Sequence, residues 1–145
     1  MAAPRVLVTG VSGYLGGNIV VHIMQKHPEW NVVVLVRSEE QKNIVLARWP
    51  KIEVVIGDLD DKELLIKEGS KADVVLRMYL LPAGLKALLQ DFSVNKICTE
   101  AASSDHVPGA VALIEGLSQK KPQPGYFIHV SGTGMMNDVS NGFGR

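Results

Sequence analysis

The stretch Arg5-Val6-Leu7-Val8-Thr9-Gly10-Val11-Ser12-Gly13-Tyr14-Leu15-Gly16 decides the fold. Its short apolar run, residues 6–8, is typical of a buried parallel strand. Glycines follow at every third position, and an amphipathic run from Tyr14 to about Gln25 predicts a helix. The N–H groups at the start of such a helix have no partner within it, and they attract phosphate. The sequence therefore predicts a pyrophosphate site where the first strand ends.

The three glycines of this stretch have different expected roles. Gly10 lets the chain reverse where a Cβ atom would clash. Gly13 lets the phosphates of a ligand approach the backbone, and Gly16 lets the helix pack close to the strand. A glycine-rich loop that binds nothing is the alternative, but the strand before this loop and the helix after it favour a binding site.

The spacing Thr9-Gly10-x-x-Gly13-x-x-Gly16 differs from the common dinucleotide fingerprint, in which the first two glycines are two residues apart. With the preceding threonine, it resembles the short-chain dehydrogenase/reductase superfamily in its extended or atypical branch, which includes the NAD-dependent epimerases and dehydratases. The resemblance implies an NAD(P)-binding Rossmann domain. It also implies that this stretch supplies cofactor-binding residues, namely Thr9, Gly10, Ser12, Gly13, Tyr14, Leu15 and Gly16.

Strand and helix patterns alternate along the rest of the chain, which is typical of a doubly wound parallel sheet. Ser38 is expected to cap the second helix, and Gly69 is expected to end the third. We predict an α/β Rossmann fold with strand order 3-2-1-4-5, truncated at its C-terminal side. The further expected strands are 32–36, 52–56, 72–76 and 126–130, and the further helices are 39–48, 61–68 and 108–119.

Composition narrows the class of protein. The 145 residues suit one domain, and an apolar fraction of 46% is ordinary for a globular protein. The formal net charge is zero, so no basic surface indicates a nucleic-acid partner. Cys98 is the single cysteine, which argues against a disulfide framework or a metal cluster. With no signal-peptide pattern and no membrane-spanning run, we expect a soluble, cytoplasmic protein.

The residue after the second strand usually selects the cofactor. A carboxylate there binds the ribose hydroxyls and repels a 2′-phosphate. This chain has Arg37 at that position, followed by Ser38. A guanidinium can stack on adenine and pair with a 2′-phosphate through two hydrogen bonds. We therefore favour NADP(H) over NAD(H), with NAD(H) and a merely solvated arginine as the alternatives.

The third strand is followed by Gly57-Asp58-Leu59. In the superfamily that this sequence resembles, an aspartate at this place accepts a hydrogen bond from the adenine amino group, and the next residue packs on the ring. Asp58 and Leu59 match that pattern. On physical grounds, Asp58 could instead cap the helix that starts near Asp61.

The resemblance breaks after the fourth strand. Residues 78–100 look inserted, because the small-residue segment expected there first appears at Ala101-Ala102-Ser103. An ordinary surface insertion is one interpretation. A translated intron is another, since the codons of Arg77-Met78-Tyr79 and Thr99-Glu100 are compatible with splice sites. The domain prediction is thus a partial Rossmann domain, 1–145, with an insertion at 78–100.

The fifth strand leads into Ser131. In the superfamily, a serine or threonine at this position contacts the substrate carbonyl, so Ser131 is the catalytic candidate, with a turn-forming serine as the alternative. His129, inside the strand, is expected to be a packed core residue. The apolar strand 126–130 should form an exposed edge, and such edges favour self-association.

The catalytic pair of the superfamily, a tyrosine with a lysine four residues later, is absent from the 145 residues. The resemblance therefore covers the cofactor half of the family domain, and enzymatic activity stays open. Three interpretations follow from it. They are a fragment of a reductase or epimerase-like enzyme, a non-enzymatic dinucleotide sensor similar to the nitrogen metabolite repression regulators, and a non-functional product of a retained intron.

Overall fold

The computed structural model describes residues 3–78, 106–120 and 122–130. Strands and helices alternate along these residues, as expected from the sequence. In chain order they are β1 (Arg5–Thr9), α1 (Tyr14–Lys26), β2 (Asn31–Val36), α2 (Glu39–Arg48), β3 (Glu53–Ile56), α3 (Lys62–Lys71), β4 (Val74–Arg77), α5 (Val107–Gln119) and β5 (Tyr126–His129).

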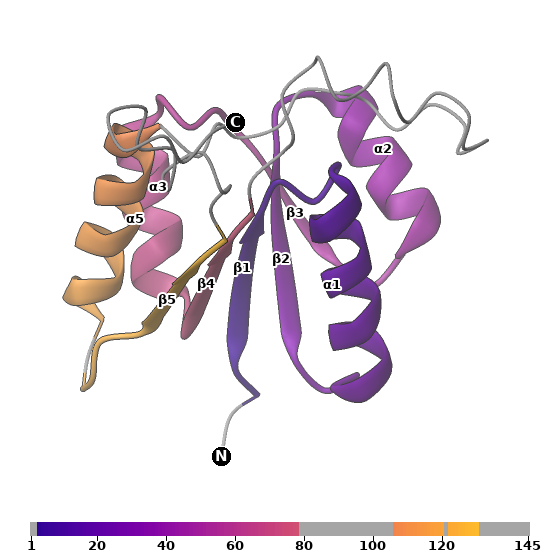
Figure 1. The fold of residues 1–145 in the computed structure, drawn as a ribbon, viewed down its shortest axis with the longest axis horizontal. Coiled ribbons are helices and arrows are strands. Elements are labelled where there is room, and N and C mark those ends of the chain that lie inside the picture. Colours follow the sequence, from indigo (N-terminus) through magenta and orange to yellow (C-terminus); the bar gives the residue numbers. More distant parts are fainter. Residues whose placement is uncertain (1–2, 79–105, 121, 131–145) are drawn as a thin grey trace, which may run out of the picture.

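The strands form one parallel sheet in the order β3-β2-β1-β4-β5, which confirms the predicted order. β1 lies in the middle, where Val8 is in register with Val34 of β2 and Leu76 of β4. Helices α1 and α2 lie on one side of the sheet, and α3 and α5 lie on the other (Figure 1). This is the doubly wound architecture of the Rossmann fold.

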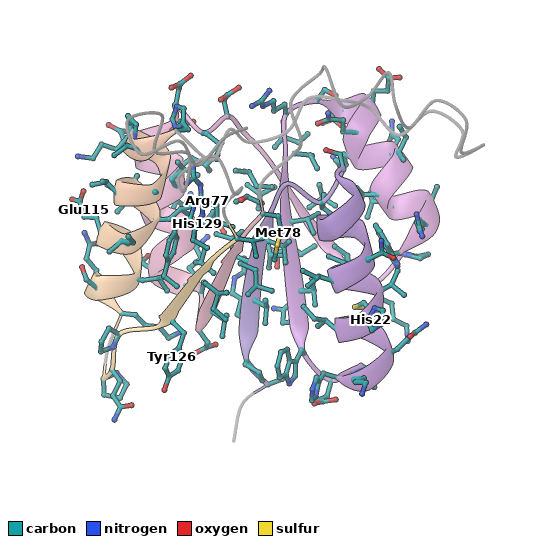
Figure 2. The ribbon with its side chains drawn as sticks, viewed as in Figure 1. His22, Arg77, Met78, Glu115, Tyr126 and His129 are labelled. Carbon is teal, nitrogen blue, oxygen red and sulfur yellow. The ribbon has the colours of Figure 1, made fainter. Side chains whose placement is uncertain are left out.

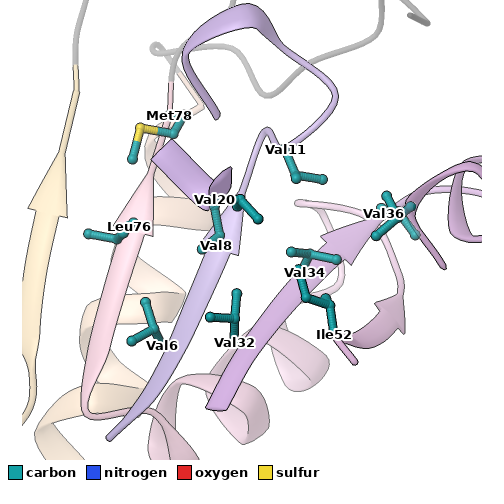
Figure 3. Packing of buried hydrophobic residues seen from close by; sticks show 11 residues of the cluster. Val6, Val8, Val11, Val20, Val32, Val34, Val36, Ile52, Leu76 and Met78 are labelled. Atoms are coloured by element: carbon teal, nitrogen blue, oxygen red, sulfur yellow. The ribbon is translucent and has the colours of Figure 1, made fainter. Parts of the chain in front are cut away.

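The core is divided by the sheet into two apolar clusters. Val6 and Val8 of β1 point to the α1 side, where they pack with Val20 of α1 and Leu76 of β4 (Figure 3). Leu7 points to the other side and belongs to the cluster under α3 and α5. Neighbouring side chains of a strand alternate between faces, so a strand with no polar interruption serves both clusters.

The helix boundaries confirm one prediction and correct two. Ser38 caps α2, because its hydroxyl oxygen accepts a hydrogen bond from the N–H of Gln41 at 3.2 Å. The cap of α3 is Asp61, whose carboxylate accepts from the Leu64 N–H at 3.0 Å, so the proposed capping role of Asp58 was wrong. Gly69 does not end α3, which continues to Lys71.

Gly69 lies inside α3 because the helix touches α5 there. A Cβ atom on Gly69 would lie 2.9 Å from the carbonyl oxygen of Leu113. Opposite it, a Cβ atom on Gly116 would lie 2.4 Å from the carbonyl oxygen of Ile66 and 3.1 Å from the Cα of Gly69. The two backbones thus approach too closely for any side chain at the crossing.

We expect Gly116→Ala to lower the free energy of unfolding by about 1–3 kcal/mol, the usual cost of overpacking. Its new methyl group would strike backbone atoms of α3, which cannot move aside as a side chain can. Urea unfolding followed by circular dichroism measures the change. Gly17→Ala in α1 is the control, since its Cβ would meet only the Val11 oxygen, at 3.4 Å. Gly17→Ala should leave the free energy of unfolding unchanged or raise it. An equal loss of this free energy in both variants would contradict the prediction.

Charged residues join the amino-terminal ends of the strands. Arg5 of β1 binds Glu53 of β3 through two hydrogen bonds, of 2.6 and 2.8 Å. The same guanidinium reaches the buried carboxylate of Glu68 in α3 at 3.1 Å, and Lys71 holds the other oxygen of Glu68 at 2.6 Å. This edge of the sheet is therefore tied to α3 by charge-assisted hydrogen bonds.

Asp73 extends these contacts to β4 and α5. Its carboxylate accepts from the backbone N–H of Arg5 at 2.7 Å and pairs with Lys120 at 2.8 Å. Hydrogen bonds from Lys120 and from the Arg5 backbone hold the pKa of Asp73 below its usual value. The hydrogen bonds of Arg5 likewise lower the pKa of Glu53.

β5 is one of the two outer strands of the sheet that the described residues form. Tyr126 is 74% exposed and Ile128 is 50% exposed, so this strand presents apolar surface as expected. Self-association through it stays a prediction. In the part of the chain that the structure describes, no helix combines the length and apolarity needed to cross a membrane.

Candidate functional site

The turn between β1 and α1 has the shape expected of a phosphate-binding turn. Gly10 adopts a φ of 76°, and a Cβ atom there would lie 2.8 Å from the carbonyl oxygen of Met78. A Cβ atom on Gly16 would lie 2.2 Å from the carbonyl oxygen of Gly10. The structural roles expected of Gly10 and Gly16 are confirmed, while their contact with a cofactor stays a prediction.

The amino terminus of α1 differs from those of the other described helices. Ser38, Asp61 and His106 cap α2, α3 and α5 with their side chains. The corresponding residue of α1 is Gly13, which has no side chain to offer, and the first turn of α1 contains no acidic residue. The helix start thus keeps N–H donors and partial positive charge available to an anion.

Thr9 ends β1 directly beneath this turn. Its side chain is 1% exposed, and its hydroxyl oxygen has no hydrogen-bond partner in the described residues. Because a buried polar atom without a partner costs free energy, this hydroxyl is a candidate to bond a ligand that lies on the turn. Ser12 is half-buried in the turn, and the side chains of Tyr14 and Leu15 lie outside the described part of the chain.

Arg37 and Asp58 lie beside each other at the carboxyl ends of β2 and β3. The two strands are held in register there, because the N–H of Gly57 donates to the carbonyl oxygen of Val36 at 2.9 Å. Arg37 Nε lies 3.6 Å from Asp58 Oδ2, and the two side chains are 36% and 52% exposed. Both predicted adenosine-binding groups are thus brought together within reach of solvent.

The backbone of Arg37 is fixed by α2. Its N–H donates to the side-chain oxygen of Gln41 at 2.9 Å, while the N–H of Gln41 donates to Ser38. This reciprocal arrangement resembles a capping box displaced by one residue. These two hydrogen bonds fix the backbone at the residue that carries the Arg37 guanidinium.

The loop after β3 sends its side chains in different directions. Asp58 Oδ1 accepts from the N–H of Asp60 at 3.3 Å, which keeps Oδ2 on the Arg37 side. Leu59 is 5% exposed and packs in the cluster under α5. Its expected contact with an adenine ring stays a prediction, and in this structure its side chain contacts the core.

Arg77 and His106 form a polar contact that the sequence did not indicate. Arg77 at the end of β4 is 2% exposed, and its Nη2 donates to the carbonyl oxygen of His106 at 2.8 Å. His106 Nδ1 accepts from the Gly109 N–H at 3.0 Å, so Nε2 carries the proton and donates to Asp60 at 2.8 Å. The signal that could have revealed the cap is a histidine just before Val107-Pro108, since proline favours a first helical turn.

His129 lies beside Arg77, in register with it at the carboxyl end of β5 (Figure 2). Its side chain is exposed, so the expectation of a packed core histidine was wrong. β5 is an outer strand, and no neighbour covers this end of it among the described residues. Partial burial, followed by the positive charge of Arg77, lowers the pKa of His129.

We expect Arg77→Gln to raise the pKa of His129, because the glutamine removes a nearby positive charge and can still donate to His106. An NMR titration of the His129 ring measures this pKa.

The pKa of His129 is lower in the folded state than in the unfolded state. The contribution of His129 to stability is therefore lost as pH falls below about 6.5. Lys26→Gln, at the far end of α1, removes the same charge as a control. An unchanged pKa of His129 in Arg77→Gln would show that the charge of Arg77 does not lower this pKa.

Several predicted positions fall outside the described residues. Ser131 is one, and residues 79–100 of the expected insertion are others. Met78, the first residue of that insertion, is described: its N–H donates to the carbonyl oxygen of Thr9 at 3.3 Å, and it is buried in the first core cluster. Among the described ranges, no group of three or more His, Cys, Asp or Glu residues could hold a metal ion.

The fold and the glycine turn define a Rossmann-type domain. The chain belongs to the NmrA-like family, whose model matches residues 3–92. It is 32% identical over 133 residues to the oxidase ucsJ of Acremonium sp, covering 91% of this chain and 32% of that protein. It is 28% identical over 130 residues to the uncharacterized protein YLL056C of Saccharomyces cerevisiae, covering 89% of this chain and 38% of that protein. The chain thus spans about a third of the length of these curated relatives.

Solved structures share the fold. The Helicobacter pylori ADP-L-glycero-D-manno-heptose-6-epimerase matches with a TM-score of 0.61 and 22% identity, over 94% of this chain and 42% of that one. A wide-type short-chain dehydrogenase/reductase of Veillonella parvula, solved in complex with NADP, matches with a TM-score of 0.59 and 12% identity, over 93% and 50%. At these identities the likeness establishes the architecture.

Proposed function

We propose that this domain binds a nicotinamide dinucleotide and prefers NADP(H) to NAD(H). The observation that carries the proposal is the start of α1, which has neither a capping side chain nor an acidic residue in its first turn. A dinucleotide pyrophosphate would supply the missing acceptor. The NmrA-like family and the NADP complex of the Veillonella parvula neighbour support the same ligand class.

The residues at the carboxyl edge of the sheet fit such a ligand. The backbone from Gly10 to Gly16 would hold the pyrophosphate, in a space that a Cβ atom on Gly10 or Gly16 would disturb. Beneath it lies the hydroxyl of Thr9, which has no hydrogen-bond partner in the part of the chain that the structure describes. Arg37 would contact the 2′-phosphate, and Asp58 would accept from the adenine amino group.

A bound nicotinamide dinucleotide supplies a hydride donor or acceptor. The proposal for these 145 residues concerns binding, because no tyrosine in them is followed by a lysine four residues later. Ser131 is proposed to contact the carbonyl of a substrate placed at the nicotinamide end.

We expect NADPH to bind more tightly than NADH in a calorimetric titration. Arg37→Ala should weaken NADPH binding by about 1.5–3 kcal/mol, the range for a hydrogen bond to a charged group, and should leave NADH nearly unchanged. Arg48→Ala, at the other end of α2, is the control for loss of a charge from the same helix. Equal affinities for the two dinucleotides in the parent protein would count against the NADP(H) preference.

A further inference from the structure

Asp58 occupies a position from which it can act on the 2′-phosphate contact. We propose that Asp58 is a specificity-determining residue: as an internal counter-ion of Arg37, it takes the place of the 2′-phosphate when that group is missing. NAD(H) can therefore still bind, and the ratio of NADP(H) affinity to NAD(H) affinity is smaller than it would be without Asp58. This inference rests on the proposed dinucleotide site and concerns how that site discriminates.

The contact between the two side chains is an ion pair that can be exchanged. The separation of 3.6 Å between Arg37 Nε and Asp58 Oδ2 exceeds the length of a hydrogen bond, so the attraction is electrostatic without a fixed donor geometry. Both groups are more than a third exposed. The contact with Asp58 can therefore be exchanged for one with a phosphate without breaking a hydrogen bond between these two side chains.

The backbones around this pair are much more firmly held than the pair itself. Arg37 is fixed by Gln41 at 2.9 Å, and the chain before Asp58 is fixed by the Gly57 bond to Val36 at 2.9 Å. Asp58 also accepts from the Asp60 N–H through its other oxygen. The two side chains therefore stay neighbours whichever ligand is present, and the carboxylate keeps one oxygen directed to Arg37.

The other charges near this corner do not replace Arg37. Lys42 of α2 pairs with Glu39 at 3.1 Å, and Glu40 adds a further negative charge to the same helical turn. On the loop after β3, Asp60 pairs with His106. Among the described residues at this corner, Arg37 is therefore the cation proposed to meet a 2′-phosphate, which would have to draw it away from Asp58.

The two dinucleotides then differ in a simple way. With NAD(H), Arg37 remains paired with Asp58 and no charge is left without a partner. With NADP(H), the phosphate takes Arg37, and Asp58 loses its partner. Removing the charge of Asp58 should raise the NADPH-to-NADH affinity ratio about two- to fivefold, as expected for an exposed ion pair.

The experiment is a calorimetric titration of NADPH and NADH into the full 145-residue chain and its variants. Asp58→Asn removes the charge but keeps an amide oxygen for the adenine amino group, so any change in that shared contact cancels in the affinity ratio. We expect the ratio to rise in Asp58→Asn and to stay constant when the same change is made in an Arg37→Ala background. Asp58→Ser, which lacks the charge and the amide, should give the same rise.

Asp60→Asn is the matched control, because it removes an equal charge from the same loop but from a residue that pairs with His106. The inference is overturned if Asp58→Asn leaves the ratio unchanged or lowers it, if the rise persists without Arg37, or if Asp60→Asn gives the same rise. Failure of the proposed function has a different signature. In that case the parent chain binds neither dinucleotide, or Arg37→Ala does not weaken NADPH.

Discussion

The contact between Gly16 and the carbonyl oxygen of Gly10 constrains the rest of the molecule. A Cβ atom on Gly16 would lie 2.2 Å from that oxygen, so α1 can start against the end of β1 only if position 16 lacks a side chain. This approach places the first turn of α1 at the carboxyl edge of the sheet. β1 itself lies in the middle of the sheet, where β2 and β4 pair with it on both sides.

The loop from Gly57 to Asp61 connects the elements around this edge. Leu59 anchors it in the core under α5, and Asp61 caps α3. Asp60 binds His106, the residue that caps α5 and receives a hydrogen bond from Arg77. A single loop therefore links the end of β3 to α3, α5 and β4, and it leaves the carboxylate of Asp58 for Arg37.

The sequence predicted the architecture because each buried strand is an uninterrupted apolar or β-branched run that serves two core clusters. It predicted the capped start of α2 because Ser38 is a strong local signal. It failed at Gly69, since a helix-ending glycine and a glycine at a helix crossing look alike until the partner Gly116 is known. It failed at His129 because the packed histidine was expected from its place inside a strand, although the exposed edge predicted for residues 126–130 pointed to an exposed side chain. Arg77 and His106 were missed because the bond between them joins residues 29 positions apart.

The two edges of the sheet use charge in opposite ways. At the amino edge, Arg5 meets Glu53 and Glu68 at 2.6–3.1 Å, and its hydrogen bonds lower the pKa of Glu53. At the carboxyl edge, Arg37 and Asp58 stand 3.6 Å apart in solvent, the hydroxyl of Thr9 has no partner in the described residues, and α1 begins without a cap. Charged groups that are already paired at hydrogen-bond distance are less able to bind a ligand. The carboxyl edge, with its looser ion pair and its helix start without a capping side chain, is therefore the edge suited to binding. The closely paired amino edge holds the strands in register.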